Sequence, residues 1–437
     1  MKVLFWCFLC CGFAFANQPK IVLIVADDLG YGDLGCYGSD LNETPHIDAL
    51  AKGGLRFTDF HSAGAMCSPT RASILTGLYP QRFGKIFDGA LSGTTMRDLG
   101  LPLEAVTLAE MLSHKGYATG CFGKWHLGYQ LPLLPTRQGF DTFRGLVSGD
   151  GDFHTQIDRS GNEDWLHNEV LVRENGYTTD LLTKHSTAFI EENRDQPFFL
   201  YVPHLAIHFP WQGPNDPPQR TAGKSWHKDK WGIIPDRGNV APHVKAMIES
   251  LDDSVGEIVA ALRKWELQED TIVVFTSDNG GYLTYGKDFQ NISSNGPLRG
   301  QKVQLYEGGH RVPFIVSWPK KISPGVTEET AHSNDLFPTF LSLAGVDAPK
   351  NDGVNLAALW FEGEAVPKRD LFWRTRSHRS VRRGSWKWIS QLREDAKPEL
   401  YDLSVDIAES KNLAAERPEI VRQLQKSWNN WNASMPD

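Results

Sequence analysis

Five short apolar runs, each followed directly by polar residues, constrain the fold more than any other feature of this sequence. Apolar runs of this length are typical of strands buried on both faces of a parallel sheet. Polar residues at the carboxyl ends of such strands are typical of a ligand site. The runs span residues 21–26, 117–122, 198–202, 271–275 and 313–317.

Helical patterns alternate with these runs at residues 106–114, 179–193 and 243–265. This alternation predicts an α/β fold in which helices cover both faces of the sheet. A further helix is expected at 334–344, and the pattern then changes to short segments rich in Trp and Arg. These segments predict a small antiparallel sheet, and a final amphipathic helix is expected from Pro418 to about Trp431.

The ends of the chain suggest how it is divided. Residues 1–16 combine one lysine, an apolar core and an Ala-Phe-Ala ending, which predicts a secretory signal peptide. No later segment offers eighteen apolar residues in a row, so we expect no transmembrane segment. We predict a large domain over residues 17–348 and a small C-terminal subdomain over residues 349–437.

Charge and cysteine content exclude two classes of protein. The chain has 45 Lys plus Arg against 53 Asp plus Glu and no long basic run, which argues against a nucleic-acid partner. Three of the six cysteines fall in the predicted signal peptide. Only Cys36, Cys67 and Cys121 remain, and an odd, sparse set is no disulfide framework.

Two pairs of polar residues follow two of the apolar runs. Asp27 and Asp28 end the first run, and Asp278 and Asn279 follow the run at 271–275. Oxygen ligands of this kind suit a hard cation such as Ca²⁺ or Mg²⁺. Because Asp, Asn and Gly also dominate turns, each pair taken alone favours a turn over a ligand set, and the occurrence of two such pairs at two strand ends shifts the balance toward a metal.

Cys67 precedes a helical pattern, with Arg71 about one turn further on. A helix amino end favours an anion, so these two residues are candidates for one anion site. A thiolate phosphatase is an alternative, but that class has five residues between Cys and Arg, and this chain has three. A buried, inert thiol is the other alternative.

Several motifs together resemble one known family. Residues 67–71 match Cys-x-Pro-x-Arg, and residues 123–128 match Gly-Lys-Trp-His-Leu-Gly; residues 26–33, 276–280 and 300–309 match in the same order. The chain is thereby similar to the type I, formylglycine-dependent sulfatases of the alkaline phosphatase superfamily, from about residue 21 to 403. The resemblance implies a large, mixed, mostly parallel sheet between helices, with a small antiparallel sheet and helix at the carboxyl end.

The resemblance also implies roles for individual residues. A divalent cation, usually Ca²⁺, would be held by the oxidised Cys67 together with Asp27, Asp28, Asp278 and Asn279. A maturation enzyme would convert Cys67 to Cα-formylglycine, whose hydrate attacks sulfur. His208 and Lys302 would assist the leaving oxygen, and His126 would accept a proton when the aldehyde re-forms. The catalytic set is Cys67, Arg71, Lys124, His126, His208 and Lys302.

The substrate is harder to predict. Residues 149–154 and 162–167 fall where relatives build the wall that receives a sugar, and residues 294–297 resemble N-acetylgalactosamine-6-sulfatases. We expect Trp165 to stack on a sugar ring; a plain polar surface loop is an equal alternative. The polar candidates for substrate contacts are Asp152, His154, Asp164, His167 and His310.

The predicted function is hydrolysis of a sulfate ester on a sugar, a sulfated polysaccharide or a glycosaminoglycan. One alternative is a phosphoester or phosphonate hydrolase of the same superfamily. A catalytically silent protein that binds sulfated glycans is the other. The predicted signal peptide implies an exported protein, periplasmic or extracellular in a bacterium and lysosomal or secreted in an animal.

Overall fold

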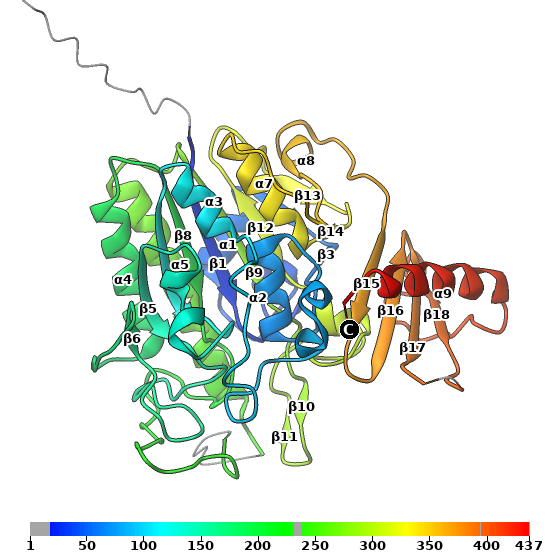
Figure 1. The fold of residues 1–437 in the computed structure, drawn as a ribbon, viewed down its shortest axis with the longest axis horizontal. Helices are drawn as coiled ribbons and strands as arrows, with labels where there is room; N and C mark the ends of the chain where they lie inside the picture. The colour runs from blue at the N-terminus through cyan, green and yellow to red at the C-terminus, as the bar shows by residue number, and fades with distance from the viewer. Residues whose placement is uncertain (1–17, 231–237, 394, 437) are drawn as a thin grey trace, which may run out of the picture.

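The computed structural model describes residues 18–230, 238–393 and 395–436. The predicted signal peptide lies outside the described residues. The chain forms a large α/β body and, beside it, a smaller sheet covered by the last helix (Figure 1). In the described part of the chain, no helix has the length and apolar character needed to cross a membrane.

A ten-stranded mixed sheet forms the centre of the large body. The five adjacent strands β9, β1, β8, β4 and β5 are parallel to one another. In order across the sheet, the strands are β13 (Gly325–Thr327), β2 (Leu55–Phe57), β12 (Phe314–Ser317), β9 (Thr271–Ser277), β1 (Lys20–Ala26), β8 (Phe198–Pro203), β4 (Ala118–Lys124), β5 (Thr142–Leu146), β6 (Leu166–His167) and β7 (Val170–Leu171).

Four of the five apolar runs form the parallel strands β1, β4, β8 and β9, as predicted. The fifth run forms β12, which is antiparallel to β9 and pairs Phe314 with Thr276. The chain stays at the carboxyl edge of β9 between these strands and reaches β12 without a crossover to the other edge. Because a parallel return needs such a crossover, β12 runs back in the opposite direction.

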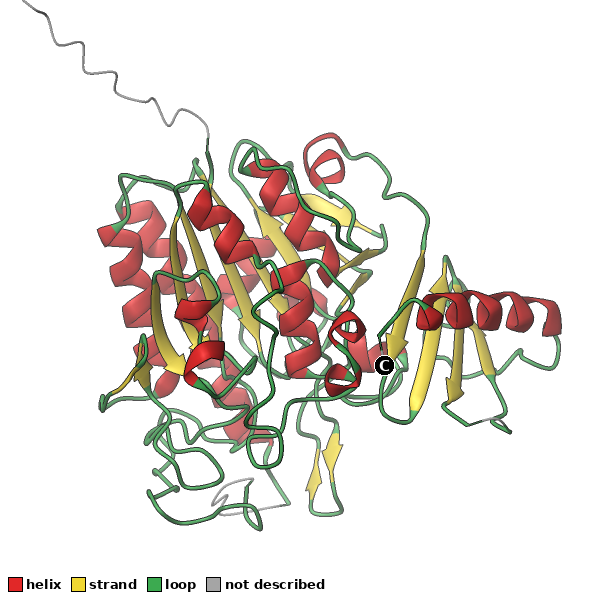
Figure 2. Cartoon of the chain, in the orientation of Figure 1, coloured by secondary structure: helices red, strands yellow, loops and turns green. Residues whose placement is uncertain are grey.

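Helices cover both faces of this sheet (Figure 2). Alternate residues of β1 point to opposite faces and join two separate apolar cores, because side chains alternate along a strand. The helices of the large body are α1 (Pro45–Lys52), α2 (Cys67–Thr76), α3 (Leu108–His114), α4 (Thr178–Glu192), α5 (Ala241–Lys264), α6 (Glu307–His310), α7 (Leu336–Leu343) and α8 (Ala357–Glu362).

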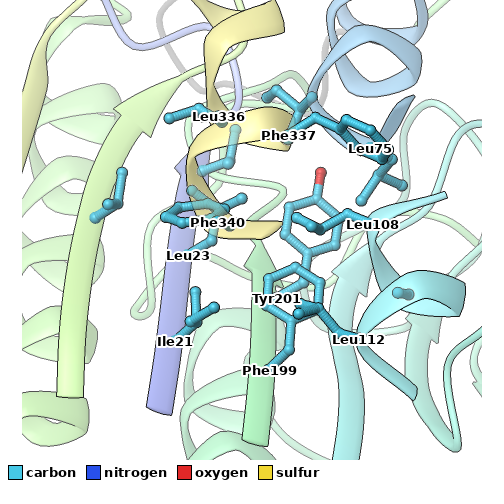
Figure 3. Packing of buried hydrophobic residues seen from close by; sticks show 14 of the residues in the cluster. Ile21, Leu23, Leu75, Leu108, Leu112, Phe199, Tyr201, Leu336, Phe337 and Phe340 are labelled. Carbon is cyan, nitrogen blue, oxygen red and sulfur yellow. The ribbon is translucent and has the colours of Figure 1, made fainter. Parts of the chain in front are cut away.

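One core lies between the sheet and helices α2, α3 and α7. Ile21 and Leu23 of β1 face Leu108 of α3 and Phe340 of α7 across this core (Figure 3). All four side chains are fully buried, and burying each aliphatic or aromatic side chain contributes about 1.5–3 kcal/mol. This packing fixes the amino end of α2 beside the strand ends that carry the acidic pairs.

The C-terminal sheet is antiparallel, and α9 packs on it. Val421, Leu424 and Trp428 of α9 form a core with Val381 and Trp388. The strand at 378–383 was missed by the sequence analysis, because its residues HRSVRR are mostly polar. The elements are β15 (Asp370–Arg374), β16 (His378–Arg383), β17 (Trp386–Gln391), β18 (Glu399–Asp402) and α9 (Pro418–Ala433).

Two small two-stranded sheets complete the fold. β3 (Phe60–His61) pairs with β14 (Ala331–His332), and β10 (Thr284–Tyr285) pairs with β11 (Phe289–Gln290). Leu356 and Trp360, at and within α8, are buried in the core of the large body. The domain limit near residue 348 stays a prediction.

Candidate active site

The acidic pairs meet at the carboxyl ends of two adjacent strands. β1 and β9 are parallel and in register, with Ala26 beside Ser277. The backbone N–H of Asp28 donates to Asp278 Oδ1 at 3.3 Å, and Asn279 Nδ2 donates to Asp28 Oδ1 at 2.8 Å. The two pairs predicted from separate runs therefore form one buried cluster.

Cys67 lies against this cluster at the amino end of α2. Its Sγ is 3.4 Å from Asp27 Oδ1 and 3.2 Å from Lys302 Nζ. Burial, with the charge of Asp27, raises the pKa of this thiol to about 12. Because a thiol acts as a nucleophile only when it loses its proton, the site is not built for an unmodified Cys67 to attack.

Three buried cations surround the three carboxylates. Arg71 Nε donates to Asp278 Oδ2 at 2.9 Å, and its Nη1 donates to the carbonyl of Lys124 at 2.7 Å. Lys124 forms an ion pair with Asp27, and Lys302 forms one with Asp28. Burial lowers the pKa of Lys302, but the Asp28 carboxylate and Cys67 raise it by more, so Lys302 is charged.

The two predicted catalytic histidines have defined proton positions. His126 Nε2 is 2.9 Å from the carbonyl of Leu91, and His208 Nδ1 is 2.7 Å from the carbonyl of Phe209. A carbonyl only accepts, so these nitrogens carry the protons. Burial and then Lys124 lower the pKa of both rings. The remaining nitrogens are thus free acceptors, and His208 Nε2 lies 3.9 Å from Asp28 Oδ2.

The cluster fits a hard cation. One ligand atom each from Asp27, Asp28, Cys67 and His208 lie within 4.8 Å of one another. Asn279 Oδ1 is buried and has no hydrogen-bond partner among the described residues. An unpaired buried carbonyl oxygen beside carboxylates is what a site for Ca²⁺ or Mg²⁺ requires.

A cavity of about 450 Å³ opens above the cluster. Of the predicted catalytic residues, Cys67, His126, His208 and Lys302 line it. Many of the lining residues belong to loops that follow the carboxyl ends of the central strands. Figure 2 shows these loops, in green, below the central sheet. Gly149 forms part of the wall and packs against the His126 ring. A larger residue would not fit there, because its Cβ would lie 2.5 Å from ring atoms of His126. The cavity gives a ligand direct access to the Cys67 side chain.

Several lining residues were missed from the sequence. Tyr129, Phe209 and Tyr285 give the cavity aromatic walls, and Arg159 and Arg376 bring positive charge to it. Tyr129 and Phe209 directly follow predicted motifs, so their proximity could have been inferred. Arg376 belongs to the C-terminal sheet, and no nearby motif indicates it.

The predicted substrate residues lie elsewhere. Trp165 is 2% exposed and donates to Glu174 Oε2 at 3.2 Å, so its ring faces a core and not the cavity. Asp164 accepts the backbone N–H groups of Val147 and Ser148. Asp152 accepts those of Gln219 and Arg220. These side chains organise the loops behind the wall.

The remaining three also point away. His154 packs on Tyr177, and His167 is exposed on β6. His310 is buried in a charged cluster between the two sheets, which we call the interface network. In the described part of the chain, none of the six predicted substrate residues lines the cavity. The interface network comprises Asp59, His61, Glu307, His310, Arg382, Lys387 and Glu409.

Comparisons with known proteins cover nearly the whole chain. The family model described as Sulfatase matches residues 19–346, and that described as N-sulphoglucosamine sulphohydrolase, C-terminal, matches residues 301–433. Arylsulfatase A of Homo sapiens is 34% identical, over 96% of this chain and 88% of that protein. The N-acetylgalactosamine-6-O-sulfatase of Bacteroides thetaiotaomicron is 30% identical, over 94% of this chain and 92% of that protein. The crystal structure of Ps i-CgsB in complex with k-i-k-neocarrahexaose superposes on this structure with a TM-score of 0.81. The two sequences are 29% identical, and the superposition covers 95% of this chain and 93% of that chain.

Proposed function

We propose that this chain, which belongs to the sulfatase family and is a sulfuric ester hydrolase, removes sulfate from a sulfated carbohydrate through an oxidised Cys67. The observation that carries the proposal is the place of Cys67. It lies at a helix amino end, between Asp27 and Lys302, on the floor of an open cavity. Its high pKa disfavours a thiolate, which supports prior conversion to Cα-formylglycine by a maturation enzyme.

A carbohydrate fits the cavity better than a wholly apolar ester. Aromatic faces at Tyr129, Phe209 and Tyr285 can stack on sugar rings, and polar groups lie between them. The N-acetylgalactosamine-6-O-sulfatase and the neocarrahexaose complex among the relatives support the same substrate class.

The metal would be held by Asp27, Asp28, Asp278 and Asn279, with an oxygen of the modified Cys67. Ca²⁺ is the ion we propose, and Mg²⁺ would suit the same oxygen donors. When bound, the ion neutralises sulfate oxygens and lowers the pKa of the attacking hydroxyl. The ion would provide a partner for Asn279 Oδ1, which is buried and has none among the described residues.

The chain's own residues supply charge and proton positions. Lys302 Nζ lies beside Cys67 Sγ and would bind the sulfate oxygens as charge moves onto the leaving group. His208 presents a free Nε2 to the cavity; an anionic ester beside it favours the protonated ring, which then donates to the leaving oxygen. Arg71 and Lys124 orient the Asp27 and Asp278 carboxylates.

His126 would act in the second half of the reaction. Its Nε2 proton is held by the carbonyl of Leu91, and its Nδ1 is buried with no partner among the described residues. That nitrogen can accept a proton from the second hydroxyl of the modified residue. The aldehyde would then re-form as sulfate leaves, a step that neither serine nor cysteine can perform.

The first test is the mass of the peptide that contains Cys67, from protein made in its native host or with the maturation enzyme. We expect the aldehyde or its hydrate. Rates on matched sulfate and phosphate esters, with and without a chelator, complete the test. Faster hydrolysis of phosphate esters would point to a phosphoesterase, and an unmodified thiol with bound sulfated glycan would point to a binding protein.

We also propose that the protein is exported, with residues 1–16 as its signal peptide. The single lysine, the apolar core and the small-residue ending support this. Sequencing the amino end of the secreted protein tests it, and a start near residue 17 is the expected result.

A further inference from the structure

A second cavity adjoins the catalytic cavity on the side of the C-terminal sheet. It measures about 370 Å³, within the range of small-ligand sites. Met66, Val303 and Arg376 line both cavities, and the first two are the direct neighbours of Cys67 and Lys302. The two cavities therefore adjoin at these three residues, one reaching the catalytic centre and the other reaching β16 and β17.

Arg376 stands where the two cavities meet. It lies in the turn between β15 and β16, and its side chain is exposed. The guanidinium lies against Gly89, where a Cβ would be 3.3 Å away, and Nη2 is 3.9 Å from Met96 Sδ. In the described part of the chain no carboxylate pairs with it.

The acidic groups of the second cavity are already engaged. Asp88 accepts from Arg374 Nε at 2.8 Å, and Glu399 accepts from the Tyr306 hydroxyl at 2.9 Å and from the hydroxyl of Tyr401. Lys397 is exposed at the edge of the cavity. The hydroxyls leave Glu399 charged, but Asp88 is neutralised by Arg374. Arg376 and Lys397, which form no ion pair with the described residues, therefore outnumber the remaining carboxylate and make the lining net positive.

Neutral polar groups complete the second cavity. Gln304, Ser377, Ser390 and Gln391 offer amide and hydroxyl groups along its walls. Hydroxyl-rich ligands are recognised by such groups, and an unpaired arginine adds selectivity for sulfate or carboxylate. The composition thus suits a second, anionic saccharide unit.

We propose that Arg376 binds an anionic group on the saccharide unit next to the one that loses its sulfate. The second cavity then holds that neighbouring unit, and the preferred substrate is an oligosaccharide or polymer with charge on adjacent units. This inference rests on the proposed function and narrows its substrate class. The anionic group is a sulfate ester or a uronate carboxylate, which share the chemistry that an arginine recognises.

The test measures binding, so it does not depend on turnover. Calorimetry gives the Kd of two probes for protein that carries Cys67→Ser, which should bind without turnover: a carrageenan hexasaccharide, whose neighbouring anion is sulfate, and a chondroitin sulfate tetrasaccharide, whose neighbouring anion is a carboxylate. We expect Arg376→Gln to weaken at least one of them about tenfold, the size of a lost charge-assisted contact. The probe that is weakened identifies the anion, and Arg376→Lys should restore part of the loss.

Two controls separate a local effect from a general one. Arg422→Gln removes an equal charge from the exposed face of α9, outside both cavities, and should leave both Kd values within twofold. The KM for 4-nitrophenyl sulfate, which has no neighbouring saccharide unit, should change less in Arg376→Gln than the Kd of the weakened oligosaccharide.

The inference is overturned if adding Arg376→Gln leaves the binding of both probes as it is in Cys67→Ser alone, if neither probe binds Cys67→Ser alone, or if the aryl sulfate loses as much as the oligosaccharides. Failure of the proposed function has a different signature. It would show as a matured wild-type protein that hydrolyses no sulfate ester, whatever its Kd values.

Discussion

The catalytic cluster and the interface network are both made of buried ionisable side chains, and they differ in how completely they are paired. The catalytic cluster lies at the ends of β1 and β9, and the interface network lies between the central and C-terminal sheets. Each brings at least three potential metal ligands within 4.8 Å of one another. By residue type alone, both are candidate metal sites.

Their hydrogen bonds distinguish them. In the interface network, the ring nitrogens of His61 and His310 face each other at 3.0 Å, while their other nitrogens face Arg382 and Lys387. In the catalytic cluster, His126 Nδ1 and Asn279 Oδ1 have no partner within the described residues. Within the described residues the interface network leaves one such atom, Glu409 Oε1, without a hydrogen bond, and that atom lies 3.7 Å from Lys387 Nζ. A largely paired cluster joins two parts of a fold, whereas one that leaves polar atoms unpaired beside a cavity awaits a ligand.

Replacing Cys67 should have the largest effect on catalysis. We expect Cys67→Ser to lower kcat by more than about a thousandfold, because serine cannot provide the diol of formylglycine in a host that does not oxidise serine. The temperature of unfolding should hardly change, since position 67 faces the cavity. Cys36→Ala, at a half-buried thiol outside the cavity, is the matched control and should keep wild-type rates. Substantial activity in Cys67→Ser would exclude the proposed nucleophile.

Two buried lysines allow a direct comparison of the clusters. Lys302→Met should lower kcat about 10²–10³-fold, since it removes a cation placed beside the reacting group. Lys387→Met should instead cost about 3–5 kcal/mol of unfolding free energy, because it leaves the buried Glu307 carboxylate without its 2.7 Å partner. Denaturant unfolding and initial rates on both variants check this pair. If Lys302→Met is the less stable and Lys387→Met the less active, the two clusters have been assigned the wrong way round.

The fold was largely predictable because its strands carry their own signal. β1 and β9 are buried on both faces, so each reads as an unbroken apolar run that ends in its acidic pair. The direction of β12 was not predictable in this way. The direction depends on the edge of the sheet at which the connection from β9 ends. The residues of β12 itself carry no signal for it.

The catalytic residues could be predicted because they belong to sequence motifs. The residues that contact the rest of the substrate could not, because no motif marks them. Cys67, His126, His208 and Lys302 belong to motifs, and the structure brings them to one cavity. Trp165 looked like a sugar platform because it stands in a polar loop, but Glu174 and a core from distant segments bury it. Arg376 had no motif at all, since only the packing of the C-terminal sheet brings it near Val303.

The protonation of the leaving oxygen can be separated from the remaining chemistry. His208→Ala should reduce hydrolysis of a sugar sulfate about a hundredfold, because an alkoxide leaves poorly without a proton. An activated aryl sulfate needs no such proton, so its rate should fall less than tenfold. Rates on both substrates across pH 5–8 test this. Equal losses on the two esters would remove His208 from the role of general acid and leave it as a contact for the cation or the sulfate.

Glu409 gives the smallest and most specific test of the interface network. The pKa of this carboxyl is raised from 4.5 to about 7. Burial is the largest cause, and the negative charge of Glu307 adds to it, while the positive charge of Lys387 acts in the opposite direction. Its Oε2 accepts the backbone N–H of Glu307 at 2.7 Å. Because the folded state holds the proton more tightly, the stability from the protonated form is complete below about pH 4.5 and is lost as the pH rises towards 7.

Glutamine imitates the protonated carboxyl and does not titrate. Glu409→Gln should therefore unfold like the wild type near pH 4.5 and be more stable by about 3 kcal/mol at pH 8, the free energy that corresponds to raising the pKa from 4.5 to about 7. Urea unfolding across this range measures the difference. Glu416→Gln, in an exposed pair with Lys411, should change stability by less than about 0.5 kcal/mol at every pH. A Glu409→Gln variant that is less stable than the wild type at pH 8 would mean that the network needs the charge of Glu409, and that its pairing, like that of the catalytic cluster, is ionic throughout.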